Sequence, residues 1–213
     1  MTEPNQLYTG LSRAAWGYFL MHVDFYLDFN GGKISLLPTF MGFLLLQSAI
    51  SRLSSERRDL ILLRPLCGLL AVWYFGEWLL LWTGREINGI VPFAVLIVTV
   101  AGLYFHFQFL TDMAALAANY QPAEGNLDRR ILRHRTGLLV LSTAADLLSG
   151  IRPLIRTESQ MELLTGGVFL LVVLLLIMAV LVMADLFRLR SCIGEREDMG
   201  PHLSETEVKN KLQ

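Results

Sequence analysis

Long apolar segments separated by short polar ones run through the whole chain of 213 residues. A helix needs about 20 mostly apolar residues to cross the hydrocarbon core of a membrane. Six segments are predicted as transmembrane helices on this criterion: 12–29, 35–53, 60–82, 88–112, 135–151 and 163–187. The last has the clearest pattern, because residues 166–184 contain no charged side chain. The chain is therefore predicted to be an all-α, polytopic membrane protein.

The polar turns after the first, third and fifth predicted helices are short. Antiparallel helices joined by a few residues must be neighbours, so we expect three helical hairpins. The first two turns share a dipeptide, Asn30-Gly31 and Asn88-Gly89, each followed by a proline. This likeness fits either an internal repeat of a helical pair or the general preference of tight turns for these residue types.

The basic residues separate into two groups when six helices are placed on the chain. Fourteen of the 18 Lys and Arg residues fall on one side, in the two terminal segments and the connections after the second and fourth helices or near the helix ends beside them. Lys and Arg collect in short cytoplasmic loops of membrane proteins. We therefore expect a multi-pass protein of the cell (inner or plasma) membrane, with both termini in the cytoplasm.

Two polar segments lie on this cytoplasmic side. Residues 118–135 contain Pro122 and Gly125, and the part after Asn126 is predicted to form a basic interfacial helix leading into the fifth span. A simple positive-inside anchor explains the same residues. The polar tail, 188–213, is mixed in charge, and we expect it to be partly disordered with one short helix near its end.

The overall composition agrees with a membrane environment. Hydrophobic residues make up 54% of the chain and charged residues 17%, whereas soluble domains carry about 25% charge. The two cysteines, Cys67 and Cys192, form neither a disulfide framework nor a metal-ligand spacing. The N-terminal segment lacks the basic start and cleavage site of a signal peptide, so we expect no cleaved leader.

Four carboxylates in the outer halves of the predicted helices are the main candidates for a binding site. An ionisable residue inside a span costs roughly 2.5 to 3.5 kcal/mol, so it needs a partner, water or a function. Asp24 and Asp28 are four residues apart and would share one face of the first predicted helix. Glu77 and Asp146 lie toward the outer ends of the third and fifth. If these three helices pack together, they form an acidic, outward-facing vestibule that binds a cation or carries protons.

An ordinary structural interpretation explains most of the same carboxylates. Asp28, Glu77 and Asp146 lie close enough to the outer interface to be solvated there. Basic residues of the external turns are candidate ion-pair partners: Lys33, Arg85, Arg152 and Arg156. Asp24 is the least easily explained in this way, because it and His22 are placed well inside the first span.

Two histidines are secondary candidates. His22 belongs to the outer half of the first predicted helix, and His106 lies near the cytoplasmic end of the fourth. His106 and Asp112 are six residues apart and do not share a helical face. The aromatic neighbours of His106 are typical of an interfacial belt and of lipid contact. We therefore predict no metal site from these residues.

Several helical positions suggest packing roles. Asp185 is expected to form an interfacial ion pair with Arg188 or Arg190 on its own helix. Small residues allow close approach of membrane helices. This role is expected for four glycines: Gly42, Gly68, Gly76 and Gly102.

The chain lacks the sequence signatures of common enzyme classes. It contains no H-E-x-x-H, G-x-S-x-G, Walker or paired-cysteine motif, so we predict no catalytic residue, no metal and no cofactor. The basic residues follow the membrane ends rather than forming a separate basic domain. This distribution does not indicate a nucleic-acid partner.

The first hairpin carries a short motif, Leu37-Pro38-Thr39-Phe40, followed by Gly42 and Phe43. In this segment the chain resembles small multi-span membrane proteins of Gram-positive bacteria with a Leu-Pro-x-Phe-x-Gly-aromatic first hairpin. The resemblance covers about 40 residues, which is the length of the predicted hairpin. Thr39 stands where those proteins have an acidic residue, and Phe43 where they have tyrosine. The resemblance implies a bacterial inner-membrane protein and no particular activity.

Three functional hypotheses follow from these patterns. The first is a small transporter-like module with a polar site formed by Asp24, Asp28, Glu77 and Asp146, whose ligand is a cation or a proton. The second is a membrane scaffold or regulatory subunit whose basic cytoplasmic loops bind a protein partner or anionic lipid. The third is an intramembrane enzyme. In all three cases the helices are embedded in the lipid bilayer, which is therefore an expected partner.

Overall fold

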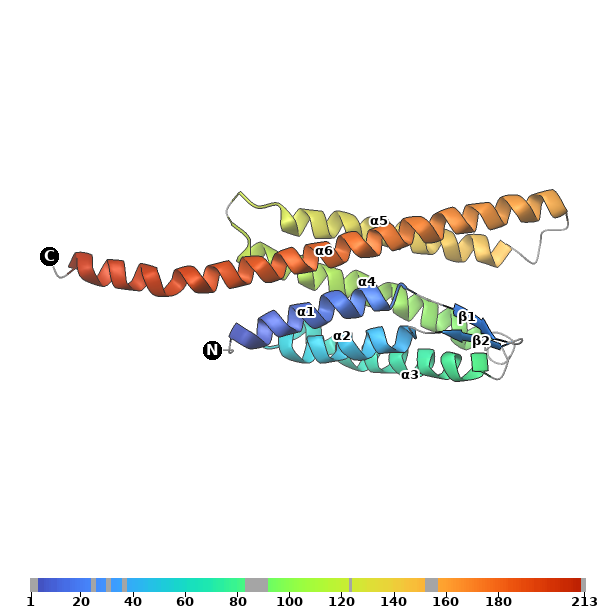
Figure 1. Ribbon diagram of the computed structural model, residues 1–213, viewed down its shortest axis with the longest axis horizontal. Coiled ribbons are helices and arrows are strands. Elements are labelled where there is room, and N and C mark those ends of the chain that lie inside the picture. The colour runs from blue at the N-terminus through green and yellow to red at the C-terminus, as the bar shows by residue number, and fades with distance from the viewer. Residues whose placement is uncertain are drawn as a thin grey trace.

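A computed structural model shows a mainly helical chain with one small β-hairpin (Figure 1). The structure describes residues 4–23, 26–29, 32–35, 38–82, 92–122, 124–151 and 157–211. The helices within these ranges are α1 (Pro4–Leu20), α2 (Thr39–Leu53), η1 (Arg58–Leu62), α3 (Leu63–Trp82), α4 (Pro92–Tyr120), α5 (Leu127–Ile151) and α6 (Glu158–Lys211). The strands are β1 (Tyr26–Phe29) and β2 (Gly32–Ser35). The predicted helical class is thus confirmed.

The six α-helices pack as a closed ring in chain order. Each helix contacts the next one along the chain, α6 returns to contact α1, and α4 also touches α6 across the ring. Figure 1 shows the start of α1 and the end of α6 at one end of the bundle and the β-hairpin at the opposite end. Consecutive helices therefore run in alternating directions.

Within the described residues, three segments are long and apolar enough to cross a membrane: Arg58–Leu81, Phe93–Tyr120 and Glu158–Glu195. They correspond to η1 with α3, to α4, and to the first two thirds of α6. Helix α2 is apolar but shorter. The structure thus supports a membrane protein, with three helices that meet the length and composition of a span.

The first predicted helix needs correction. Residues 12–29 were expected to be helical throughout, whereas α1 begins at Pro4 and ends at Leu20, and Tyr26–Phe29 form β1. In the antiparallel register Phe29 pairs with Gly32, so Asn30-Gly31 separates the strands in the sequence. Asn-Gly is the strongest short signal for a two-residue hairpin. This local preference explains why the polar turn folds as a β-hairpin.

The segments that were predicted to be cytoplasmic also differ from expectation. Helix α4 continues to Tyr120 and α5 begins at Leu127, so the basic residues after Asn126 belong to α5 itself rather than to a separate interfacial helix. The short connection is closed by a hydrogen bond from the Gly125 amide to the Pro122 carbonyl, at 2.8 Å. Helix α6 runs without interruption to Lys211, in place of the partly disordered tail that was predicted.

The closest packing occurs between α1 and α2. A Cβ atom at Gly42 would lie 2.7 Å from the Gly17 carbonyl oxygen, and one at Gly17 would lie 2.9 Å from that of Gly42. The two backbones therefore touch at this crossing. The predicted role of Gly42 is confirmed, whereas Gly76 and Gly102 have no heavy atom within 4 Å of the equivalent position and mediate no close approach.

Candidate interior site

Tyr18 on α1 and His106 on α4 meet in the interior of the bundle. Tyr18 is fully buried, and its hydroxyl lies 3.1 Å from Nδ1 of His106. The Tyr18 ring also stacks on Phe109, one turn further along α4, with centroids 6.0 Å apart. Residues 88 positions apart in the sequence are thus joined through a phenol and an imidazole.

His22 completes this group of polar rings. It follows α1 directly and lies one helical turn beyond Tyr18. Its Nδ1 is 2.9 Å from the Tyr18 backbone carbonyl, and its ring centroid is 5.1 Å from that of His106. A carbonyl oxygen only accepts hydrogen bonds, so Nδ1 of His22 carries the proton and Nε2 is the basic nitrogen of the neutral ring. We call Tyr18, His22 and His106 the interior site.

The interior site has the chemistry of a single-cation site. Neutral imidazole nitrogens accept protons and bind first-row transition-metal ions. Two imidazoles this close cannot both be protonated without strong repulsion, so the pair accommodates one cation at a time. Among the described residues no group of three or more His, Cys, Asp or Glu side chains is arranged to hold a metal ion. A closed metal cage is therefore not formed by these described side chains.

Three of the four predicted carboxylates, Asp28, Glu77 and Asp146, lie within the described residues, on β1, α3 and α5. Asp24 lies outside the described residues. Asp28 lies in β1, opposite Lys33 in the register, and not on a helical face shared with Asp24. Glu77 accepts a hydrogen bond from Trp73 Nε1 at 3.1 Å, one turn earlier on α3.

Asp146, the fourth carboxylate, is exposed on α5. Helix α5 packs against α4 and α6, whereas α3 packs against α2 and α4, and α1 against α2 and α6. Helices α1, α3 and α5 thus alternate with α2, α4 and α6 around the ring. Direct packing of α1, α3 and α5, on which a common acidic vestibule depends, is not among the main contacts between the described elements.

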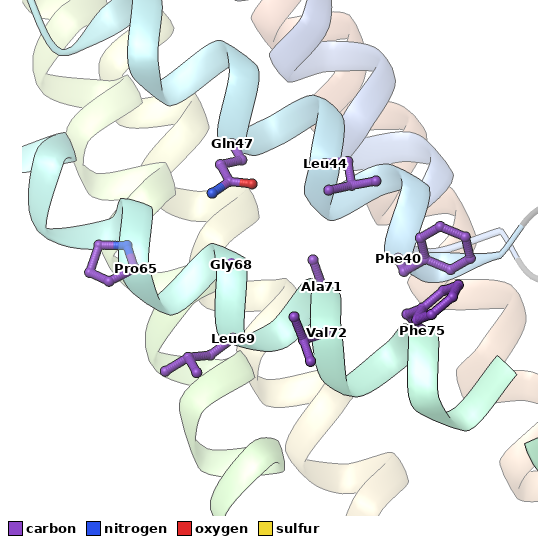
Figure 2. Close-up of a pocket in the computed structure, with 9 residues that line it drawn as sticks. All are labelled: Phe40, Leu44, Gln47, Pro65, Gly68, Leu69, Ala71, Val72 and Phe75. Atoms are coloured by element: carbon purple, nitrogen blue, oxygen red, sulfur yellow. The ribbon is translucent and has the colours of Figure 1, made fainter. Parts of the chain in front are cut away.

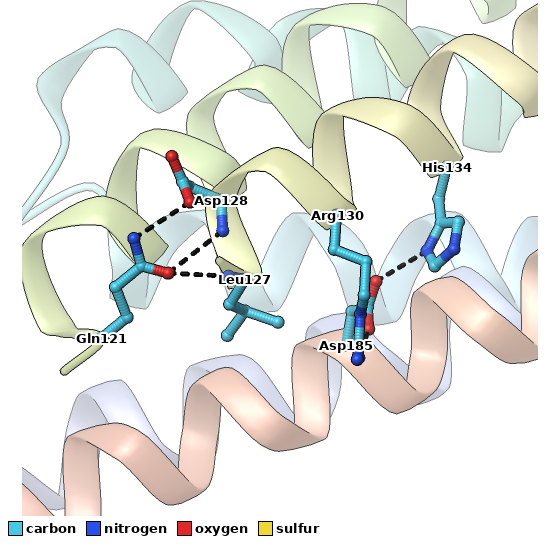
Figure 3. A network of polar contacts seen from close by, with 6 residues as sticks. All are labelled: Gln121, Leu127, Asp128, Arg130, His134 and Asp185. Carbon is cyan, nitrogen blue, oxygen red and sulfur yellow. Dashed lines mark hydrogen bonds and ion pairs between the residues drawn. The ribbon is translucent and has the colours of Figure 1, made fainter. Parts of the chain in front are cut away.

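A second polar cluster lies between α5 and α6, and Figure 3 shows its members. The carboxylate of Asp185 is 1% exposed, pairs with Arg130, and lies 2.7 Å from Nδ1 of His134. Both partners come from α5, so the predicted pairing of Asp185 with Arg188 or Arg190 on its own helix is wrong. Arg190 instead donates to Ser12 Oγ on α1, at 2.9 Å.

Further polar contacts link other helices in the same half of the bundle. The Arg57 guanidinium lies 3.6 Å from the buried carboxylate of Asp112, which also accepts a hydrogen bond from Gln108. Arg135 donates to Thr111 Oγ1 at 2.7 Å. We call the contacts of Arg57, Arg130, Arg135 and Arg190 with α1, α4 and α6 the inner polar layer. They tie α5, α6 and the α2–α3 connection to their neighbours by directional bonds.

The connection between α4 and α5 is fixed by Gln121. Its side-chain oxygen accepts hydrogen bonds from the backbone amides of Leu127 and Asp128, and its amide nitrogen donates to the Asp128 carboxylate at 3.0 Å (Figure 3). The hydrogen bond from Gln121 lowers the pKa of Asp128 below its ordinary value. Gln121 thus satisfies two of the free amides at the start of α5.

A groove of about 730 Å³ lies between α2 and α3 and is shown in Figure 2. Its lining is apolar except for the side chain of Gln47 on α2. The lining residues are Phe40, Leu44, Gln47, Pro65, Gly68, Leu69, Ala71, Val72 and Phe75. The groove is therefore suited to an apolar occupant rather than to an ion.

No protein-family model, curated protein or solved structure matches the chain. The likeness of the first hairpin to small membrane proteins of Gram-positive bacteria therefore stays a prediction. Function has to be inferred from the arrangement of the residues themselves.

Proposed function

We propose that the chain crosses the membrane six times and has both termini in the cytoplasm. An odd number of crossings would put the chain ends on opposite sides, whereas α1 begins and α6 ends at the same end of the bundle (Figure 1). That end also carries the basic connections expected on the cytoplasmic side. Large apolar side chains point outward on the ring, with Phe93 81% and Leu163 79% exposed. A hydrocarbon environment accounts for this exposure.

Within this topology, we propose a small transporter-like protein whose interior site takes up one cation. The observation that carries the proposal is the contact of His22 with His106 in the bundle interior, with ring centroids 5.1 Å apart. Ionisable groups in a membrane interior are rare and mark ion or proton pathways. The cation is a proton or a late first-row transition-metal ion, since both bind to a neutral imidazole nitrogen. The four carboxylates stay candidate groups for the outer approach to this site.

Thermal unfolding of the detergent-purified protein tests the proposal. A ligand that binds only the folded state increases the free energy of unfolding, by about 2.7 kcal/mol at 100 times its dissociation constant, and so raises the melting temperature. We expect Zn²⁺, Cu²⁺, Ni²⁺ or a change of pH to shift the wild-type melting temperature, and Na⁺ and K⁺ to leave it unchanged. The variants His22→Gln and His106→Gln should lose the shift.

A matched control separates the interior site from general metal binding. His134→Gln removes an imidazole that lies outside the interior site, beside Asp185 between α5 and α6, and should keep the full response to metal ions. A response that is equal in all four proteins, or absent from the wild type, would contradict the cation site. A response that follows the metal and not pH identifies a metal ion as the ligand, and the reverse identifies a proton.

A second candidate function is the scaffold or regulatory subunit that binds a partner or anionic lipid at its cytoplasmic end. It is favoured by the excess of arginine in the inner polar layer over its two buried carboxylates, Asp112 and Asp185. Among the described residues, the buried Nε groups of Arg57, Arg130 and Arg190 have no hydrogen-bond partner. Retention of acidic lipid or of a protein through purification, lost when these arginines are replaced, would support this candidate.

A further inference from the structure

The groove between α2 and α3 has the length of one membrane leaflet. It extends along α3 from Pro65 to Phe75. Ten residues of helix correspond to about 15 Å at 1.5 Å per residue. This is half of a hydrocarbon core that is about 30 Å thick. The groove starts at the inner end of α3, so in the proposed topology it lies in the cytoplasmic leaflet.

The walls of the groove are apolar and open to the outside of the ring. Leu69 is 69% exposed and Val72 is 71% exposed, and the aromatic rings of Phe40 and Phe75 close its outer end with centroids 5.1 Å apart (Figure 2). Gly68 leaves space within the groove, because it has no side chain. The volume lies within the range of small-molecule sites, about 300 to 1,000 Å³.

Polar groups occur only toward the inner end of the groove. Arg64 directly precedes Pro65, and Arg58 lies in η1, which leads into α3; both are exposed and neither pairs with a described acidic residue. The amide nitrogen of Gln47 lies 3.3 Å from the position of a Cβ atom on Gly68, in the inner half of the groove. The groove therefore has basic residues next to its inner end, a hydrogen-bond donor in its inner half and apolar walls in its outer half.

We propose that this groove binds an anionic phospholipid of the cytoplasmic leaflet. One acyl chain occupies the groove as far as Phe40 and Phe75, the ester carbonyl accepts a hydrogen bond from Gln47, and the phosphate lies beside Arg64 and Arg58. Juxtamembrane basic residues attract acidic headgroups in this way. The inference rests on the proposed membrane embedding but is independent of the interior cation site.

Lipid titration of the delipidated protein, followed by native mass spectrometry, tests this site. Wild type should bind one phosphatidylglycerol molecule in preference to phosphatidylcholine. Val72→Trp fills the groove and should weaken this binding about tenfold or more, corresponding to 1.4 kcal/mol. Val100→Trp is the matched control, because Val100 is an exposed apolar residue of α4 outside the groove, and it should bind like wild type.

The headgroup contact has its own pair of variants. Arg64→Gln should reduce the preference for phosphatidylglycerol over phosphatidylcholine about fivefold, as expected for one basic residue beside an acidic lipid. Arg133→Gln, an exposed arginine of α5, should leave the preference unchanged. His106→Gln should bind lipid normally, so that failure of the cation site and failure of the lipid site are distinguishable.

Three results would overturn the proposal. The first is equal lipid binding by Val72→Trp and Val100→Trp. The second is equal binding of both lipids by wild type. The third is a dimer that dissociates in Val72→Trp, which would assign the groove to a second copy of the chain. Leu69→Trp, at another exposed position of the groove wall, provides the same test if Val72→Trp does not fold.

Discussion

Asp185 is the residue at which a single substitution should have the largest effect on stability. Its carboxylate is buried and holds both Arg130 and His134. Removing one partner of a buried ion pair leaves the other charge without compensation, at a cost of about 3 kcal/mol or more. We therefore expect Asp185→Asn to lower the free energy of unfolding by about 3 kcal/mol, measured by thermal or denaturant unfolding in detergent. Asp59→Asn, an exposed carboxylate 3.8 Å from Arg57, should change it by less than about 0.5 kcal/mol.

The members of the interior site differ in whether the sequence identifies them. His22 and His106 stand out as ionisable residues in apolar segments, and both were identified as candidates. Their contact was not predicted, because the fourth helix was expected to end at residue 112, which placed His106 near the cytoplasm. Helix α4 extends from Pro92 to Tyr120, so His106 lies at its centre. Tyr18 was not identified, because nothing in the sequence distinguishes it from the other aromatic residues of the apolar segments.

At the level of elements, the crossing of α1 and α2 gives a clear prediction. The Cβ atom of Gly42→Ala would meet the Gly17 carbonyl oxygen at 2.7 Å, a distance that backbone atoms cannot relieve without separating the helices. Overpacking of this kind costs about 1 to 3 kcal/mol. We expect Gly42→Ala to lower the melting temperature of the purified protein, and a neutral result would show that the helices are further apart than described.

Gly76→Ala is the matched control for this crossing, and it should raise the melting temperature instead of lowering it. Gly76 lies within α3, and no heavy atom is found within 4 Å of the position of its Cβ. Replacing a helical glycine by alanine in open space stabilises a helix by about 0.5 to 1 kcal/mol. The sequence marks both positions as small residues in apolar helices. It cannot tell them apart, because the difference depends on which helix lies opposite.

Element boundaries agree with the expected spans at one helix end and differ at another. The end of α2 at Leu53 coincides with the expected end of the second span. The first helix was extended too far, because periodicity does not distinguish a short apolar strand from a helix. The Asn-Gly signal for a β-hairpin lay in the same turn and would have corrected the boundary.

At the level of the whole molecule, the ring of helices determines which residues can cooperate. The sequence predicts that consecutive helices are neighbours, because their connections are short. It does not predict that α6 returns to α1, which closes the ring and separates α1, α3 and α5 from one another. The predicted acidic vestibule required α1, α3 and α5 to pack together, and the sequence does not determine how the ring closes. Contacts across the ring, such as Tyr18 with His106, likewise depend on closure rather than on local sequence.

Labelling of two introduced cysteines distinguishes a topology of six membrane crossings from one of three. If only the three strongest candidate spans crossed the membrane, Lys33 and Glu124 would lie on the same side, because α3 and α4 both separate them along the chain. With six crossings α2 also separates them, and they lie on opposite sides. In a background with Cys67 and Cys192 replaced by alanine, we expect Lys33→Cys to react with a membrane-impermeant maleimide in intact cells and Glu124→Cys to react only after permeabilisation. Equal labelling of both cysteines would contradict the six-span topology and, with it, the placement of the interior site and of the α2–α3 groove within the membrane.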